Sequence, residues 1–166
     1  MRQTSEAFRD AAFAQETGEA VITLLTVTHD SLATPIRLSS DPTVRLSDDP
    51  LSYGTISRDE TYLFLPFEVT LGDDRDDVPT RVELRLDNAD RALVGLLREV
   101  SSPPVIEVEM VLSGSPDLVE VSLPALRLAD VRYDAAGISA ELVVDGLQGE
   151  PYPAARFDRS RFPGLF

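Results

Sequence analysis

The residues from Val21 to Val27 constrain the fold more than any other part of the chain. They read Val-Ile-Thr-Leu-Leu-Thr-Val, which is rich in β-branched side chains and apolar on both faces that a strand would present. A strand of this kind is covered on both sides, as in the middle of a layered β structure. We therefore expect a central strand here, which is easiest to bury if another sheet or a neighbouring subunit covers it.

Further short segments with strand character follow along the chain. They alternate apolar and polar residues and are separated by Pro, Ser, Asp and Gly. The expected strands are residues 35–38, 44–46, 62–71, 81–86, 105–112, 118–123, 126–133 and 138–144. Pro66, inside one of them, implies an edge strand or a bulge. Because hairpins join consecutive segments, the pattern predicts a mainly β fold, an antiparallel sandwich or barrel.

Two helices are expected beside these strands. Residues 4–16 predict a short N-terminal helix, with Thr4 or Ser5 as its cap and Gly18 at its end. A second helix is expected at about 88–100, where it would cover an open edge or face of the sheet. The predicted organisation is an N-terminal helix or arm (1–18), a β-domain (19–146) and an extended C-terminal arm (147–166).

The charge balance disfavours two classes of partner. The chain has 29 acidic and 15 basic residues, for a formal net charge of −14. Phosphate backbones and anionic lipids are bound by Lys and Arg, so neither specific nucleic-acid binding nor membrane binding is expected. No apolar run approaches the length of a membrane helix, and the first residues do not predict a signal peptide.

Residue types that commonly carry catalysis are scarce. The chain has no Cys and a single His, so thiolate chemistry is excluded and a zinc site would need mainly carboxylates. His29 could form a Ser/His/Asp catalytic triad with Ser31 or Ser39, but no nucleophile-elbow sequence is present. We favour the interpretation of His29 as a turn residue. We expect neither an enzyme nor a bound cofactor or metal.

Two acidic groups have plain structural interpretations. The run from Asp73 to Asp77 lacks the ligand order of a calcium loop and predicts a solvated hairpin loop, with a weak cation site as the alternative. Glu107 and Glu109 are spaced by two residues, as on the exposed face of an amphipathic strand.

The C-terminal residues favour assembly. Three prolines stiffen this segment, which lowers the entropy lost when it docks, and aromatic side chains supply the apolar area. Packing of the arm on its own domain is an equal alternative. The residues concerned are Tyr152, Phe157, Phe162, Leu165 and Phe166.

Several stretches, taken in order, resemble a known family. They are Ala11–Glu19, Leu32–Leu38, Pro66–Leu71, Arg85–Arg91, Ser101–Pro104 and Phe162–Phe166. Together they resemble the small tail-tip or distal tail proteins of long-tailed bacteriophages, prophages and gene transfer agents, long described as a domain of unknown function. The resemblance covers essentially the whole chain, and its motifs are structural rather than catalytic.

The resemblance implies a structural virion protein at the tip of the tail. The implied role is a distal tail or upper baseplate ring that joins the tail tube to the hub and the receptor-binding apparatus. The implied partners are further copies of the chain, the tail tube protein, the hub or fibre protein and other tail-tip proteins. The implied location is the virion, after assembly in the host cytoplasm.

Within that role, a hexameric ring is favoured over a trimeric hub component, and a host-adhesion module is a more remote alternative. Phe8 and Phe13, with the C-terminal aromatic residues, are candidates for contacts between subunits. An acidic lumen would repel exiting DNA, and this is a hypothesis suggested by the net charge. Its candidate residues are Asp73, Asp74, Asp76, Asp77, Glu107 and Glu109.

Overall fold

The computed structural model describes residues 4–72, 81–87, 102–133 and 137–144. Within these ranges the chain forms one helix and a single sheet of ten strands. The elements are α1 (Glu6–Phe13), β1 (Val21–Thr28), β2 (Ile36–Ser39), β3 (Val44–Asp48), β4 (Leu51–Ser57), β5 (Glu60–Phe64), β6 (Phe67–Leu71), β7 (Arg81–Asp87), β8 (Val105–Leu112), β9 (Ser115–Tyr133) and β10 (Gly137–Val144).

The sheet is open and almost entirely antiparallel. Its strand order is β3-β4-β5-β2-β1-β8-β9-β10-β7-β6, so β3 and β6 form the two edges. Every neighbouring pair is antiparallel except β2 and β5, which run parallel. The expected mainly β, sandwich- or barrel-like fold is therefore confirmed. The helix expected at about 88–100 lies outside the described residues.

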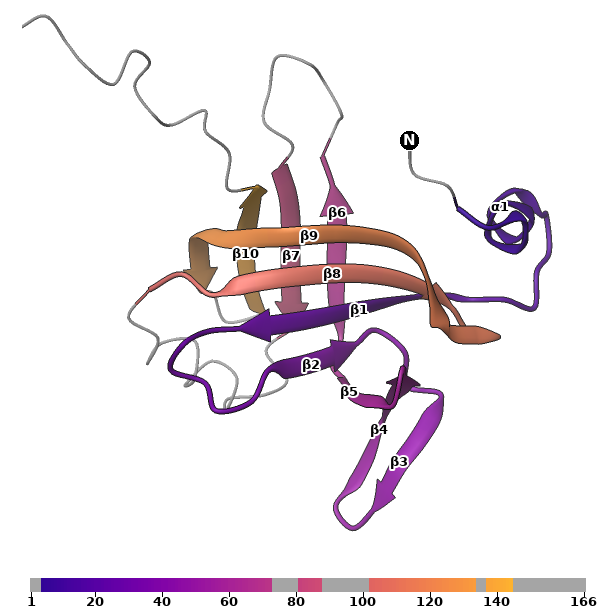
Figure 1. The fold of residues 1–166 in the computed structure, drawn as a ribbon, viewed down its shortest axis with the longest axis horizontal. Helices are drawn as coiled ribbons and strands as arrows, with labels where there is room; N and C mark the ends of the chain where they lie inside the picture. Colours follow the sequence, from indigo (N-terminus) through magenta and orange to yellow (C-terminus); the bar gives the residue numbers. More distant parts are fainter. Residues whose placement is uncertain (1–3, 73–80, 88–101, 134–136, 145–166) are drawn as a thin grey trace, which may run out of the picture.

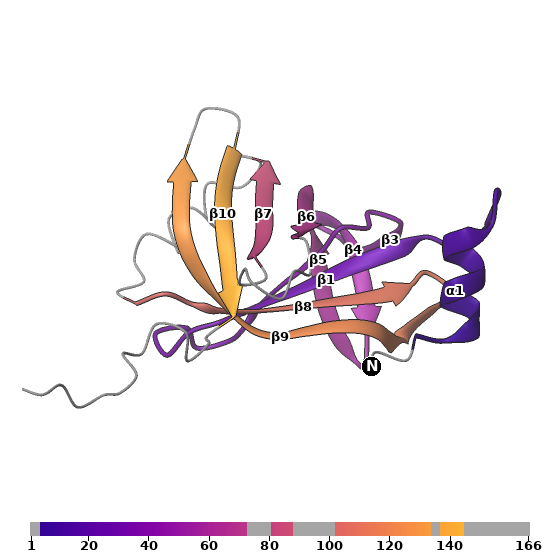
Figure 2. The same ribbon diagram turned by 90° about the horizontal axis from the view of Figure 1, so that it is seen from above.

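Strand β9 allows one sheet to form two layers. It is 19 residues long, and its first part pairs with β8 while its last part pairs with β10. Between the two parts the β8–β9 register shifts, and Ala125 adopts a positive φ of 45°. Figures 1 and 2 show the consequence: β6, β7 and β10 form a layer that crosses the layer of β1, β2 and β8.

The main core fills the space between these layers. Alternate residues of β1 and β8, such as Leu25 and Val108, point toward alternate residues of β7 and β10, such as Leu84 and Leu142. All four of these side chains are at most 2% exposed. Burial of each such side chain contributes roughly 2 kcal/mol, so this cluster is the main source of stability.

A second, smaller cluster covers the other face of β1. Leu24, like Leu25, is only 1% exposed, and it packs with Ile22, Val111 and the ring of Tyr62 from β5. The prediction of a strand that is apolar on both faces is confirmed. The covering element, however, is the chain's own β4–β5 hairpin, so the burial of this strand gives no argument for a partner subunit.

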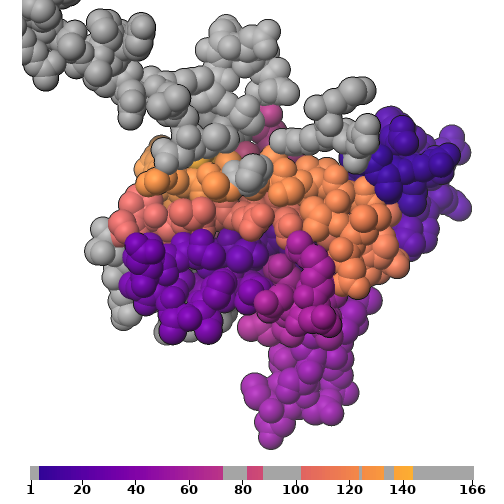
Figure 3. All heavy atoms as spheres, in the orientation of Figure 1, coloured from indigo at the N-terminus to yellow at the C-terminus, as the bar shows by residue number. Residues whose placement is uncertain are grey.

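The β3–β4 hairpin protrudes from the body of the molecule (Figures 1 and 3). It carries apolar side chains that the described residues leave in contact with solvent: Val44, Leu51 and Tyr53 are exposed to 44%, 58% and 39%. Its turn contains a cis peptide bond between Asp49 and Pro50.

Three strand predictions are corrected by the structure. Residues 62–71 form two strands rather than one, because the chain leaves β5 before Pro66 and enters a different part of the sheet as β6. Residues 118–123 and 126–133 form the single strand β9, in which Pro124 and Ala125 fall at the register shift. Strand β4 was not predicted.

The N-terminal helix is confirmed but is shorter than predicted. Ser5 is its cap and accepts a hydrogen bond from the backbone N–H of Phe8, at 3.0 Å. The helix ends at Phe13, with Ala14 as its C-cap, so Gly18 does not terminate it. Both the N–H and the hydroxyl of Ser5 donate to the carboxylate of Glu120 on β9, at 2.7 and 2.6 Å, which fixes the start of the helix to the sheet.

Candidate functional site

The β4–β5 turn carries the best-defined polar site among the described residues. Ser57 and Glu60 close the hairpin as a cross-strand pair, and Arg58 and Asp59 between them have positive φ values of 52° and 63°. Two consecutive residues of this kind are the signature of a two-residue type I′ hairpin loop. The turn therefore directs the Arg58 side chain away from its own hairpin, toward β8.

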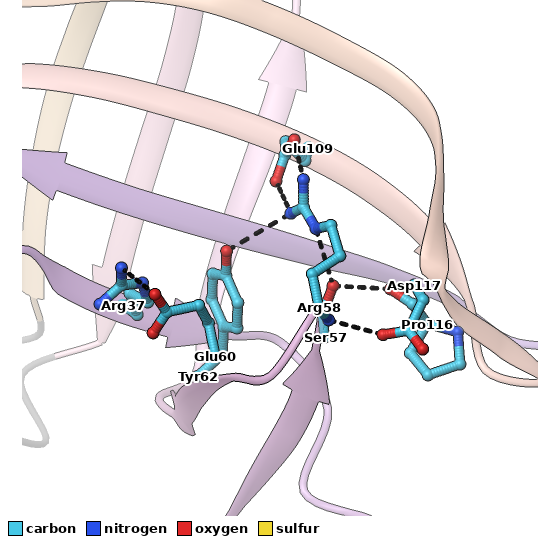
Figure 4. A network of polar contacts seen from close by, with 8 residues as sticks. All are labelled: Arg37, Ser57, Arg58, Glu60, Tyr62, Glu109, Pro116 and Asp117. Carbon is cyan, nitrogen blue, oxygen red and sulfur yellow. Dashed lines mark hydrogen bonds and ion pairs between the residues drawn. The ribbon is translucent and has the colours of Figure 1, made fainter.

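Arg58 binds Glu109 of β8 through both terminal nitrogens (Figure 4). Its Nη1 donates to Glu109 Oε1 at 3.0 Å, and its Nη2 donates to Oε2. Nη2 also lies 3.5 Å from the hydroxyl oxygen of Tyr62. A bidentate guanidinium–carboxylate pair is stronger and more specific in geometry than a single ionic contact.

Two further hydrogen bonds fasten the same turn to the beginning of β9. The Ser57 hydroxyl donates to the carbonyl oxygen of Pro116 at 2.7 Å, and the backbone N–H of Arg58 donates to Asp117 Oδ1 at 2.5 Å. We call the group Ser57, Arg58, Glu109, Pro116 and Asp117 the turn lock. It joins the β4–β5 turn to β8 and β9, and the joined residues are 51 and 59 positions apart in the chain.

The electrostatics of the turn lock are dominated by the partly buried ion pair. Glu109 is 8% exposed, whereas the side chain of Arg58 is 41% exposed. The hydrogen bond to Glu109 is the main cause that raises the pKa of Arg58 above its ordinary value, and the small burial of the guanidinium opposes it. Arg58 therefore remains a cation, and the carboxylate of Glu109 is neutralised within the chain.

We expect Arg58→Ala to lower the free energy of unfolding by about 2 kcal/mol. The substitution leaves a buried carboxylate without its cation, and the partial exposure of Arg58 lets water offset some of that loss. Urea unfolding followed by circular dichroism would measure the change. The matched control is Glu60→Gln, which removes the charge of the half-exposed partner in the 3.0 Å Arg37–Glu60 ion pair and should change stability by no more than about 0.5 kcal/mol. Equal losses in the two variants would contradict the role given to Arg58.

A shallow hollow lies beside the turn lock. It has a volume of about 280 Å³ and is lined by Arg37, Arg58, Glu60, Glu107 and Glu109, together with Thr26 and Tyr62. Four of its five charged side chains are already engaged in the pairs Arg37–Glu60 and Arg58–Glu109. This arrangement neutralises charge within the chain and fixes the hairpin, and it leaves Glu107 as the one lining carboxylate outside those two pairs.

The structure separates the two carboxylates that the strand pattern placed together. Glu107 is exposed, as predicted. Glu109 is buried and bound by Arg58, so its prediction as part of an exposed acidic face is wrong. The reason is that the β4–β5 turn folds over this part of β8. The four predicted acidic residues of the 73–77 loop lie outside the described residues.

The predicted interface residues are covered only in part. Phe8 is half-buried, and Phe13 is 87% exposed at the end of α1. The residues Tyr152, Phe157, Phe162, Leu165 and Phe166 lie outside the described part of the chain.

His29 follows β1, as expected of a turn residue, and both of its ring nitrogens face serine hydroxyls. Nδ1 lies 2.7 Å from Ser31 Oγ, and Nε2 lies 2.7 Å from Ser102 Oγ. A serine–histidine hydrolytic site also needs a group that orients the imidazole, usually a carboxylate. Within the described residues, no hydrogen bond joins this ring to a carboxylate, and the contacts fasten the end of β1 to the segment before β8.

The turn lock was missed at the sequence level. Its local signal is the tetrapeptide Ser57–Glu60, whose polar centre separates two segments that could pair as a hairpin. No local signal indicates that Arg58 meets Glu109, because that contact depends on how the hairpin folds onto the sheet.

The described residues contain no group of three or more His, Asp or Glu side chains that could hold a metal ion. Nor do they include a helix of the length and apolar character that a membrane span requires.

The fold and the turn lock define a mainly β protein built on one open sheet that is folded into two layers. Residues 7–157 match the family described as a domain of unknown function, DUF1833. The chain belongs to this family. No match is found among the curated proteins.

Proposed function

We propose that the protein is a structural subunit of a bacteriophage tail tip, in the distal tail or upper baseplate ring. In that position it would connect the tail tube to the hub and the receptor-binding apparatus. The proposal is supported by the ordered series of stretches, from Ala11–Glu19 to Phe162–Phe166, that resemble small tail-tip proteins.

The observation that carries the proposal is the protruding β3–β4 hairpin. Three of its apolar side chains are exposed and so do not stabilise an isolated chain in water: Val44, Leu51 and Tyr53. The hairpin is joined to β5, and the turn lock fixes the β4–β5 turn to β8 and β9. A protruding hairpin that is anchored at the turn lock and presents apolar side chains is suited to contact with another subunit.

The net charge supports the same role in a second way. At −14 per chain, a ring of subunits would repel DNA that passes through it. Glu107 stays a candidate for an acidic surface of this kind, whereas Glu109 does not, because its charge is neutralised by Arg58. A ring whose acidic residues all face outward would contradict this part of the proposal.

Labelling of intact particles would test the location. Particles from the strain that encodes the chain would be treated with gold-labelled antibody to the purified protein and viewed by electron microscopy. Gold at one end of the tail supports the proposal, whereas particles without label, despite full reactivity of the free protein, would refute it.

The mass of the purified protein would then separate the two structural roles. Light scattering behind a sizing column gives the number of 18.2 kDa chains in each assembly. Six chains support a distal tail ring, and three support the alternative of a hub-associated component.

A further inference from the structure

The two edge strands of the sheet match in length and, followed along the sheet, in sense. Strands β3 and β6 have five residues each, and each has one strand neighbour among the described residues. Between them lie eight antiparallel pairings and one parallel pairing. Followed along the sheet, an even number of reversals gives β3 and β6 the same sense, although the bend of the sheet points them differently in space (Figure 1). A second copy that continued the sheet without being turned over would therefore pair its β3 with β6 in parallel.

The sequences of the two edges are complementary in that orientation. When Val44–Leu46 is aligned in register with Phe67–Val69, Val44 meets Phe67 and Leu46 meets Val69. On each strand the residue between the two apolar positions is charged, so Arg45 lies opposite Glu68. The match ends at Leu46, because the pairing of β3 with β4 shifts register between Arg45 and Ser47. Cross-strand pairs of apolar residues and of opposite charges both stabilise strand pairing.

The alignment also respects the two faces of the sheet. Cross-strand partners point to the same side of a sheet. Val44 is linked through its partner Gly54, and through Leu63, to the core residue Leu38, so Val44 lies on the core-side face. On β6, Phe67 and Val69 pack against the core on that same side. A shift of one residue would set apolar side chains beside charged ones, so the pattern specifies the register.

The exposure of these residues is consistent with an unoccupied contact. Arg45 is 57% exposed by side chain, and its ion pair with Asp48 is at the surface, so exchange for Glu68 would cost little. Glu68 is exposed and lies beside Arg85 in the β6–β7 pairing. Edge strands with one neighbour, as β3 and β6 are among the described residues, readily add a strand from another chain.

We infer that copies of this chain join edge to edge, with β3 of one copy adding in parallel to β6 of the next. The contact is head-to-tail, so it closes into a ring or continues as a filament. The inference deepens the proposed function, because it names the surfaces through which the subunits of the ring meet, and it rests on self-association rather than on the location in a tail.

A charge exchange tests the contact. Arg45→Glu and Glu68→Arg each place like charges across the proposed junction and should weaken self-association at least about tenfold. In a ring of six chains or in a filament, alternation of the two variants in an equimolar mixture restores an opposite-charge pair at every junction, so the mixture should assemble as the unchanged protein does. Sedimentation velocity over a range of concentrations measures this. Two variants that associate normally alone, or a mixture that stays dissociated although both variants are folded, would overturn the inference.

Cysteine cross-linking provides a second test, because the chain contains no Cys. Residues directly opposite on neighbouring strands are about 4.8 Å apart, which a disulfide can span. Arg45→Cys and Glu68→Cys proteins, mixed in equal amounts and oxidised with copper–phenanthroline, should form the mixed dimer well beyond the roughly twofold excess over each homodimer that random pairing gives, as read by mass spectrometry. The control pairs Arg45→Cys with Glu107→Cys, an exposed position within the sheet.

The results also separate this inference from the proposed function. Equal cross-linking at 68 and 107 would refute the edge contact, even if gold labelling places the protein at a tail tip. Selective cross-linking at 68 with no label on particles would uphold the edge contact and refute the tail location.

Discussion

Gly54→Ala is expected to cost at least about 3 kcal/mol of folding free energy and to disrupt the pairing of β4 with β5. A Cβ atom at this position would lie 1.9 Å from the carbonyl oxygen of Tyr62 and 3.0 Å from the backbone nitrogen of Phe64. Both are backbone atoms of the neighbouring strand, so the clash cannot be relieved by a side-chain rotation. The strand would have to move, and Tyr62 would leave its place over Ile22 and Leu24.

Thermal unfolding would measure this effect, as a fall in Tm of roughly 9 °C for a domain of this size. The matched control is Gly18→Ala, because a Cβ at Gly18 has no atom within 4 Å. That variant should keep the Tm of the parent protein to within a few degrees. A Gly54→Ala protein that melts with the control would mean that β4 and β5 are not held at the separation described.

Leu25→Ala should lower stability by about 3 kcal/mol, through the loss of apolar burial and the cavity that remains. Leu25 is 1% exposed and belongs to the core between the two layers. The core cluster that contains Leu25 also draws side chains from β2, β7, β8, β9 and β10, so the site cannot collapse by moving one strand. Chemical denaturation would report the loss as a lower midpoint at an unchanged slope.

Phe13→Ala is the control for Leu25→Ala. It removes a larger apolar side chain, but Phe13 is 87% exposed and should contribute less than about 0.5 kcal/mol to the folded monomer. If the two variants lost equal stability, the assignment of Leu25 to the main core would be wrong.

The strands with clear two-residue alternation could be predicted from the sequence. In β7, Val82, Leu84 and Leu86 alternate with charged residues, and this local pattern alone fixes which side faces the core. Strand β1 was predicted from a different signal, its apolar character on both faces, which correctly indicated that it is covered twice.

Strand β4 could not be found in this way. It has the sequence Leu-Ser-Tyr-Gly-Thr-Ile-Ser, with a glycine at its centre and buried serine and threonine hydroxyls where a core strand usually has aliphatic side chains. The hydroxyl of Thr55 lies 2.7 Å from that of Ser39 on β2, which satisfies both groups inside the protein. Hydrophobic periodicity does not detect a strand whose buried side chains are polar and bonded to another strand.

The turn lock could not be predicted from the sequence, for a related reason. The local pattern of β8 places Glu107 and Glu109 on the same face, and their exposure differs because Arg58 reaches one of them. Which carboxylate a distant turn will cover depends on the path of the whole β2–β5 segment. Local alternation thus gives the orientation of a side chain, whereas its partner is a property of the tertiary fold.

Strand β9 has a consequence for the way the molecule opens. Its backbone is a continuous member of both layers, hydrogen-bonded first to β8 and then to β10. Neither layer can separate from the core without releasing a strand that the other also requires, so the two layers belong to a single cooperative unit in local unfolding. The β3–β4 hairpin stands outside that unit, and its fluctuations are restrained by a few contacts at the turn lock. We therefore expect the two layers to unfold together, whereas the β3–β4 hairpin can fluctuate independently of them.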